Sequence, residues 1–257
     1  MYVVTAVVVI ISLLLHELAH IGLVKAFGGQ VRAVRVRVAG LGAWVRGVER
    51  FALWKRYGVY LAGPLVNGFI AFFAVWLMGS HTAVIELGAT LEAGGRGLIY
   101  IEVLQNIFLY NMVLCVFNLL PVLPLDGGRL MQLFLGNRMG VIRANRVLLK
   151  IGPFFGGLLM CLGLVQAVLY PGNISLLCAG KYIRDKNKEL PAMLYWEFVQ
   201  GLKAKEGRVL RVKKITLPKD MPAKQALEYL GLDYWGEIDI GGGVCISEKE
   251  LVRRLLT

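Results

Sequence analysis

Four long stretches with few or no charged side chains constrain this chain more than any other feature of its sequence. A helix needs about 20 apolar residues to cross the roughly 30 Å hydrocarbon core of a bilayer. The stretches are Met1–Val24, which contains one short polar cluster, Tyr57–Gly79, the 23 residues between Glu102 and Asp126, and the 30 residues between Lys150 and Lys181. They predict a multi-pass α-helical membrane protein.

The overall composition agrees with a membrane protein. Hydrophobic residues make up 57% of the 257 residues, only 18% are charged, and the mean hydropathy is +0.62. Soluble domains are about a quarter charged, so an ordinary cytosolic enzyme is disfavoured. The high apolar content also disfavours a disordered chain and a nucleic-acid-binding arm. The four cysteines lie far apart in the chain, which excludes a disulfide scaffold and a paired-cysteine zinc knuckle.

The distribution of basic residues predicts how the chain crosses the bilayer. Lys25–Arg56 contains eight basic residues and Arg129–Lys150 contains five, whereas Ser80–Tyr100 contains one. Because basic loops stay in the cytoplasm, the first two segments are expected there and the N-terminus outside. Pro171-Gly172-Asn173 interrupts the fourth stretch, which predicts a helix, a tight turn and a short or re-entrant return leg over Ile174–Gly180.

The polar cluster in the first stretch has the spacing of a metal site. His16 and His20 lie four residues apart, so on a helix they share one face and can bind one zinc ion. Glu17 between them is placed to accept a proton from metal-bound water. A cleaved signal peptide is disfavoured, because no basic residue precedes the apolar run. Packing of a polar face against other helices is the alternative, but a carboxylate inside a membrane helix costs about 2.5–3.5 kcal/mol.

A third ligand is needed, because catalytic zinc sites usually have three protein ligands and one open position. Asp126 ends the third apolar stretch and is followed by two glycines. Pro121 and Pro124 precede it and cannot continue a regular helix. Irregular backbone at membrane depth is tolerated only against protein or a water-filled cavity, so Asp126 is expected in a polar cavity near the cytoplasmic side.

Three motifs in this order resemble the site-2 proteases, which are zinc intramembrane metalloproteases. The motifs are His16-Glu17-Leu-Ala-His20, Gly63-Pro64-Leu-Val-Asn67 and Asn118-x-x-Pro121-x-x-Pro124-x-Asp126-Gly127. The resemblance covers about residues 1–150. The segment that follows makes the chain similar to the sporulation stage IV FB-like group, whose type member cleaves a membrane-associated pro-sigma factor.

The resemblance implies a role for each matching residue. His16, His20 and Asp126 would hold Zn²⁺, and Glu17 would be the catalytic general base and then acid. Asn118 and Asn67 would contact the substrate or its oxyanion. The implied partners are the lipid bilayer, a membrane-associated protein substrate and inhibitory membrane proteins, with no nucleic acid. Only 15 residues precede His16, fewer than is usual in this group, so a leading helix is expected to be absent or missed.

A substrate helix hides its carbonyl groups in its own hydrogen bonds, so it must unwind before cleavage. Residues 31–48 alternate with a period of two around two glycines, which predicts a short β-hairpin at the cytoplasmic interface. Its free edge could pair with the unwound substrate by strand addition. Contact of its arginines with lipid headgroups is an equally weighted alternative.

The sequence of the C-terminal segment predicts a small α+β domain. We expect a strand at 209–217, a helix at 223–230, strands at 236–240 and 243–246, and a helix at 248–256. This order is similar to one CBS repeat, which implies binding of ATP or another adenine nucleotide. A single repeat buries little surface, so a homodimer is expected. A substrate-docking or stabilising domain is the alternative.

The predicted organisation is therefore a membrane-embedded protease domain at 1–180 with its core at 1–150, a linker at 181–206, and a CBS-like cytoplasmic domain at 207–257. Two rival functions remain open. A catalytically inactive membrane regulator would usually have lost one of the four residues of the metal cluster. A metal transporter needs polar residues on several helices, and apart from that cluster these helices are nearly without them.

Overall fold

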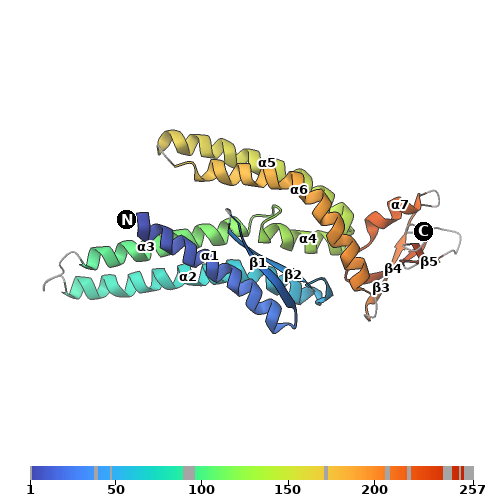
Figure 1. The fold of residues 1–257 in the computed structure, drawn as a ribbon, viewed down its shortest axis with the longest axis horizontal. Helices are drawn as coiled ribbons and strands as arrows, with labels where there is room; N and C mark the ends of the chain where they lie inside the picture. Colours follow the sequence, from blue (N-terminus) through green and yellow to red (C-terminus); the bar gives the residue numbers. More distant parts are fainter. Residues whose placement is uncertain are drawn as a thin grey trace. The chain divides into compact units, whose positions relative to one another are not determined.

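The computed structural model describes residues 2–37, 40–46, 48–88, 96–170, 173–205, 209–218, 221–239, 245–248 and 250–251. The chain divides into two compact units (Figure 1). The first comprises Met1–Val48 and Lys55–Leu120, and the second comprises Glu49–Trp54 and Pro121–Thr257.

The first unit is formed mainly by three long helices and a hairpin. Its elements are α1 (Tyr2–Ala26), β1 (Gln30–Arg37), β2 (Gly40–Arg46), α2 (Leu53–Gly88) and α3 (Arg96–Asn118), and a short 3-10 turn, η1 (Val48–Arg50), precedes α2. Helix α1 packs against α3 and against both strands of the hairpin. Side chains on α1, α2 and α3 also meet through hydrogen bonds, which build the site described below.

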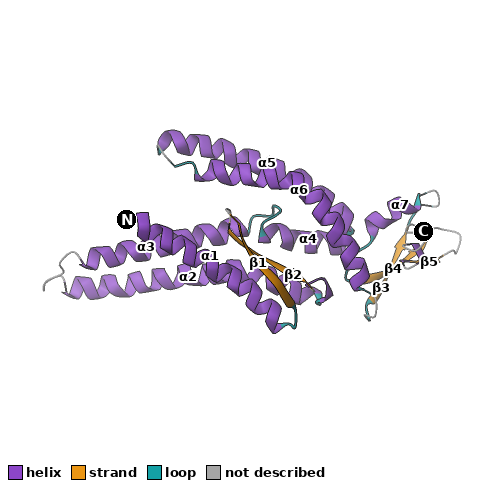
Figure 2. Cartoon of the chain, viewed as in Figure 1, coloured by secondary structure: helices purple, strands orange, loops and turns teal. Residues whose placement is uncertain are grey.

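The hairpin expected between residues 31 and 48 is confirmed. Strands β1 and β2 pair antiparallel, from Gln30 opposite Arg46 to Arg37 opposite Gly40, with an irregularity between Val31 and Ala33. They form a two-stranded sheet, so each strand has one edge without a partner strand in that sheet. Figure 2 distinguishes this hairpin from the helices by colour.

The second unit begins with three helices, α4 (Asp126–Met139), α5 (Val141–Leu169) and α6 (Ser175–Ala204). Helices α5 and α6 run side by side along most of their lengths (Figure 1). Glycines allow this close approach: a Cβ atom on Gly163 would clash with Leu177, and one on Gly156 would clash with Arg184. Small residues at such an interface let two helix backbones pack closely.

Helix α6 differs from the sequence-based expectation. In place of a short return leg over 174–180 and a linker over 181–206, one continuous helix runs from Ser175 to Ala204. The charged residues after 180 obscured an amphipathic pattern, in which buried Ile183, Leu190, Leu194 and Phe198 recur at helical spacing. Residues 129–150, expected as a loop, likewise lie mostly within α4 and the start of α5.

The C-terminal segment has the expected order of elements where it is described. Its elements are β3 (Arg211–Thr216), α7 (Ala223–Ala226), the 3-10 turn η2 (Leu227–Tyr229), β4 (Tyr234–Asp239) and β5 (Cys245–Ser247). The sheet order is β3-β4-β5, with β3 parallel and β5 antiparallel to β4. Most of the helix expected at 248–256 lies outside the described residues. The CBS-like identity, nucleotide binding and homodimer stay predictions.

The core of the C-terminal segment includes residues from α5 and α6. Val141 and Phe198 belong to the same buried cluster as Leu230 and Ile238. The Val141 amide also donates to the carbonyl of Leu230 over 2.9 Å. The segment is therefore built onto the two helices within the second unit.

Charged side chains add to this attachment. Arg146 on α5 forms a bidentate hydrogen bond to Glu228 in η2. The guanidinium of Arg146 lowers the pKa of the Glu228 carboxyl from its usual range, mainly through the hydrogen bond. A buried pair of Lys205 and Glu248 joins the end of α6 to the sheet region.

Four of the described helices are long and apolar enough to cross a bilayer, judged by length and composition. They are Val3–Ala26, Leu53–Ser80, Tyr100–Asn118 and Val141–Leu169. These correspond to the four predicted stretches. The third helix ends at Asn118, before the predicted end of its stretch, and Pro121 and Pro124 lie in the irregular segment that follows.

Candidate metal centre

Two histidine rings on α1 face one another. Because His16 and His20 are one helical turn apart, their Nε2 atoms lie only 3.2 Å from each other. The Nδ1 atom of His16 lies 2.5 Å from Oδ1 of Asn67 on α2. The Nδ1 atom of His20 lies 2.6 Å from the backbone carbonyl oxygen of Val59 on the same helix.

These partners determine which ring nitrogen carries the proton. A carbonyl oxygen only accepts hydrogen bonds, so Nδ1 of His20 must donate to Val59. The amide nitrogen of Asn67 points toward oxygen atoms of Ser12 and Asn111, so its Oδ1 faces His16 and accepts from Nδ1. With the proton on Nδ1, each ring turns an Nε2 lone pair toward the other ring, an arrangement suited to binding a metal ion.

Gly63 leaves room beside the two lone pairs. A Cβ atom placed on this residue would clash with Nε2 of His20 and with Nε2 and Cε1 of His16. No side chain therefore separates the backbone of α2 from the two nitrogens. The space and the donor atoms together fit a metal ion held by imidazole nitrogens.

Asn67, for which the resemblance implies a contact with the substrate or its oxyanion, lies beside His16 in the structure. Its side chain is fully buried, with 0% exposure. Both of its polar atoms are used inside the protein, by His16 on one side and by Asn111 and Ser12 on the other. A side chain placed in this way can orient the His16 ring, and its contact with a substrate stays a prediction.

The sequence analysis missed Asn111 and Ser12. Both are buried, on α3 and α1. A polar residue within an apolar stretch is itself a signal, because unpaired polar groups are costly in a membrane. Asn111 lies in the middle of the third stretch and carried that signal.

The other predicted residues are placed as follows. Glu17 follows His16 on α1 and is partly buried. Asn118 is the last residue of α3, and its Nδ2 donates to the Leu114 carbonyl over 2.9 Å. The structure therefore brings His16, His20 and Asn67 together within the first unit.

Asp126 belongs to the second unit, where it is the first residue of α4 and is partly buried. The preceding irregular segment packs closely on the start of this helix, since a Cβ atom on Gly128 would clash with the backbone of Val122 and Leu123. A carboxylate in the first turn of a helix is favoured by the helix dipole. Asp126 therefore offers a carboxylate oxygen from a tightly packed turn.

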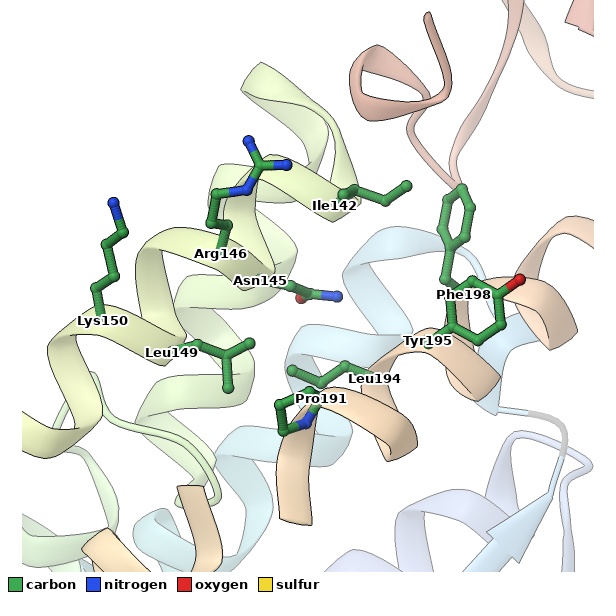
Figure 3. A pocket seen from close by; sticks show the side chains of 9 residues that line it. All are labelled: Ile142, Asn145, Arg146, Leu149, Lys150, Pro191, Leu194, Tyr195 and Phe198. Carbon is green, nitrogen blue, oxygen red and sulfur yellow. The ribbon is translucent and has the colours of Figure 1, made fainter. Parts of the chain in front are cut away.

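A separate hollow of about 360 Å³ lies between α5 and α6 in the second unit. Figure 3 shows Asn145, Arg146 and Lys150 of α5 on one side and Leu194 and Tyr195 of α6 on the other. None of the described residues that line it is His, Cys, Asp or Glu. The hollow therefore lacks the side chains that bind zinc.

Comparisons with known proteins agree with this geometry. Residues 83–162 match the model of peptidase family M50. The fold of the chain is similar to that of the site-2 protease from Methanocaldococcus jannaschii, with a TM-score of 0.52 and 21% identity over 84% of this chain and 82% of the other.

Several relatives of the chain are named as zinc metalloproteases. Zinc metalloprotease MJ0392 of Methanocaldococcus jannaschii is 21% identical over 225 residues, which are 87% of this chain and 60% of the relative. Putative zinc metalloprotease Rip3 of Mycobacterium tuberculosis is 34% identical over 170 residues, 63% of this chain and 39% of the relative. Stage IV sporulation protein FB of Bacillus subtilis is 27% identical over 152 residues, which are 59% of this chain and 47% of the relative.

The chain thus spans 60% of the length of the first of these relatives and 39% of the second. With its four apolar helices, the chain is a mainly helical membrane protein. The names of its relatives support Zn²⁺ as the metal.

Proposed function

We propose that this chain is an intramembrane zinc metalloprotease, in which His16, His20 and Asp126 hold the zinc and Glu17 is the general base. One observation carries the proposal: the Nε2 atoms of the two histidines lie 3.2 Å apart while each Nδ1 is engaged by an acceptor. A histidine pair with this arrangement is well suited to bind a metal ion.

The set of donor atoms suits zinc. Two neutral imidazole nitrogens and one carboxylate oxygen form a common catalytic ligand set, which leaves a fourth position open. The carboxylate of Asp126, at the start of α4, would complete the set. When bound, zinc lowers the pKa of water toward 7 and polarises the scissile carbonyl.

The protein side chains would then move the protons. Glu17 lies next to His16 on α1, and its carboxylate would accept a proton from the attacking water and pass it to the leaving amine. Asn118 uses its Nδ2 in one hydrogen bond to Leu114. An amide nitrogen has two hydrogens, so the second could donate to the substrate oxygen on which negative charge develops.

The substrate would be a membrane-associated protein that enters as an extended strand. A helical substrate must first give up its internal hydrogen bonds. The two-stranded sheet of β1 and β2 offers unpaired backbone edges that could hold such a strand. Binding of lipid headgroups by the same hairpin is the competing assignment.

The finer assignments rest on sequence patterns and on the relatives. A pro-sigma factor as substrate follows from the likeness to stage IV sporulation protein FB. A catalytic centre near the cytoplasm, with a cytoplasmic C-terminal segment, follows from the basic residues in 25–56 and 129–150. Binding of ATP or another adenine nucleotide at 207–257, a homodimer through that segment and inhibitory membrane partners are further proposals from the resemblance.

The test is co-expression of the chain with candidate membrane substrates. We expect Glu17→Gln to keep zinc, because the ligands are intact, and to abolish cleavage, because the general base is gone. Asp126→Ala should lose both zinc and cleavage. Product formation and metal content of the purified proteins measure the two effects.

Three outcomes would contradict parts of this proposal. Undiminished product from Glu17→Gln would remove the general base assignment. Stoichiometric zinc in Asp126→Ala would remove the third ligand. A wild-type chain that binds zinc and substrate without cleaving would instead be the inactive membrane regulator.

A further inference from the structure

A continuous series of hydrogen bonds leads from His16 to the middle of α3. Oδ1 of Asn67 faces Nδ1 of His16, and Nδ2 of Asn67 donates to Oδ1 of Asn111 over 2.8 Å. Nδ2 of Asn111 donates to the backbone carbonyl of Ile107 over 2.8 Å and to Oγ of Ser12 over 2.9 Å. His16, Asn67, Asn111 and Ser12 are all buried.

The Ile107 carbonyl determines which group donates and which accepts at each step of this series. This oxygen can only accept, so Asn111 must turn its amide nitrogen toward Ile107 and its oxygen toward Asn67. Asn67 must then turn its own nitrogen toward Asn111 and its oxygen toward His16. An oxygen opposite Nδ1 requires a proton on Nδ1 and leaves Nε2 unprotonated.

We propose that Asn111 is a positioning residue, which acts through Asn67 to hold His16 in the tautomer that carries its proton on Nδ1. The hydrogen bonds of Asn111 join it to Asn67, Ser12 and the Ile107 carbonyl, so it acts on His16 through Asn67. Its oxygen is the nearer of two acceptors for the Asn67 nitrogen, at 2.8 Å against 3.4 Å for the Ser12 backbone carbonyl, and so has the larger part in deciding which end of the Asn67 amide meets His16. Asn111 thereby keeps the Nε2 lone pair available to the metal. The inference rests on the proposed function in taking His16 as a zinc ligand.

The two histidines differ in how their tautomers are set. His20 donates directly to the Val59 carbonyl, which cannot reverse its role. His16 donates to an amide, which can rotate to present either oxygen or nitrogen. Only His16 therefore needs a second residue behind its partner.

Asn111→Leu removes the nearer of the two acceptors that orient Asn67 and leaves only the longer bond to the Ser12 carbonyl. We expect the Asn67 amide to populate both orientations, so that the affinity for zinc falls about 10-fold, as is typical when an outer partner of a ligand is lost. The measurement is competition for zinc with a chelator in detergent micelles. It is followed by nitrogen-15 NMR of the metal-free protein labelled at histidine.

The NMR readout is simple because the chain contains only three histidines. His81→Gln removes the third, so the remaining signals belong to His16 and His20. At a pH where the rings are neutral, we expect one tautomer for each ring in the parent protein. A second tautomer should appear for His16 in Asn111→Leu, while His20 stays unchanged.

Asn106→Leu is a matched control. Asn106 lies on the same helix and makes the same kind of bond to a backbone carbonyl four residues earlier, that of Glu102, over 2.9 Å. This bond does not involve Asn67. We expect neither the zinc affinity nor the tautomers to change in this variant.

Asn67→Asp supplies a rescue. A carboxylate has only acceptor oxygens to offer Nδ1, so it needs no orientation from Asn111. Combined with Asn111→Leu, it should restore the single tautomer and return the zinc affinity toward that of the parent. Asn111→Asp, which keeps an acceptor for Asn67, should also show a single tautomer, and it serves if Asn111→Leu does not fold.

The proposal is overturned if Asn111→Leu keeps the parent affinity and a single His16 tautomer. It is also overturned if Asn111→Asp shows two tautomers, or if Asn67→Asp does not rescue a loss in Asn111→Leu. A parent protein that binds no zinc would remove the proposed function instead. The tautomer comparison in metal-free protein would still decide the role of Asn111.

Discussion

Gly63 is the residue at which the smallest substitution should have the largest effect on the histidine pair. In Gly63→Ala the added methyl group would clash with Nε2 of both His16 and His20. The rings cannot simply turn away, because Asn67 and Val59 hold their Nδ1 atoms. We expect the zinc affinity to fall by about 10-fold or more, measured by metal analysis after equilibrium dialysis.

Gly79→Ala is the matched control for this change, on the same helix. A Cβ atom there has no neighbour within 4 Å, so zinc binding should be unaffected. If Gly63→Ala bound zinc as well as Gly79→Ala does, the metal would not lie beside the two Nε2 atoms.

At this scale the sequence predicted ligands better than their supports. His16 and His20 could be found because a helix places residues i and i+4 on one face. The role of Asn67 could not be found, since it depends on which α1 residue it meets across the helix interface. The partners of Asn111 and Ser12 could not be found for the same reason, although the position of Asn111 within an apolar stretch was a signal that it is paired.

At the scale of elements, the hairpin β1–β2 offers a direct test of strand addition. Val36, opposite Leu41 in the pairing, is the position for Val36→Pro. Proline lacks an amide hydrogen and disturbs strand pairing, so cleavage should fall while zinc content stays unchanged. Val36→Thr, which keeps a β-branched residue, is the control. Undiminished cleavage in the proline variant would rule out strand addition at this position.

The buried pair of Lys205 and Glu248 should stabilise the junction between α6 and the sheet. Nζ of Lys205 lies 2.5 Å from Oε1 of Glu248, and the two side chains are 1% and 2% exposed. Lys205→Met would leave a buried carboxylate without its cation, which costs about 3–5 kcal/mol. We expect a lower free energy of unfolding by about that amount, measured by denaturant titration in detergent.

Replacing both partners should be much milder than replacing one. In Lys205→Met combined with Glu248→Leu, no charge is left buried, although Gly236 loses the acceptor of its amide. Equal losses in the single and double variants would mean that the ion pair is not what joins these elements.

For the whole molecule, the sequence predicted the apolar helices well and the division of the chain poorly. Hydropathy identified four stretches that correspond to the four candidate spans, because lipid demands long apolar helices. Hydropathy also placed the end of the membrane domain at residue 180, but helix α6 continues through this position to Ala204. The charged residues on the exposed face of an amphipathic helix make its sequence similar to that of a linker when the buried face is not known.

The C-terminal segment, with its proposed boundary at 207, shares its core with α5 and α6. The core of the C-terminal segment contains Val141 of α5 and Phe198 of α6, and Leu202 of α6 packs against it. A segment as short as 207–257 buries too little surface without these residues to fold alone. We therefore expect the isolated segment to lack a cooperative thermal transition, measured by circular dichroism.

Removing the same segment from the full chain should expose the partners that it covers. Val141 and Phe198 are 8% and 4% exposed in the intact chain and would become open to solvent. The truncated protein should then aggregate more readily in detergent than the full chain, as size-exclusion chromatography would detect. A cooperative transition in the isolated segment, together with a monodisperse truncated protein, would instead establish an independent domain. In that case the contacts with α5 and α6 would be a docking surface and not part of its core.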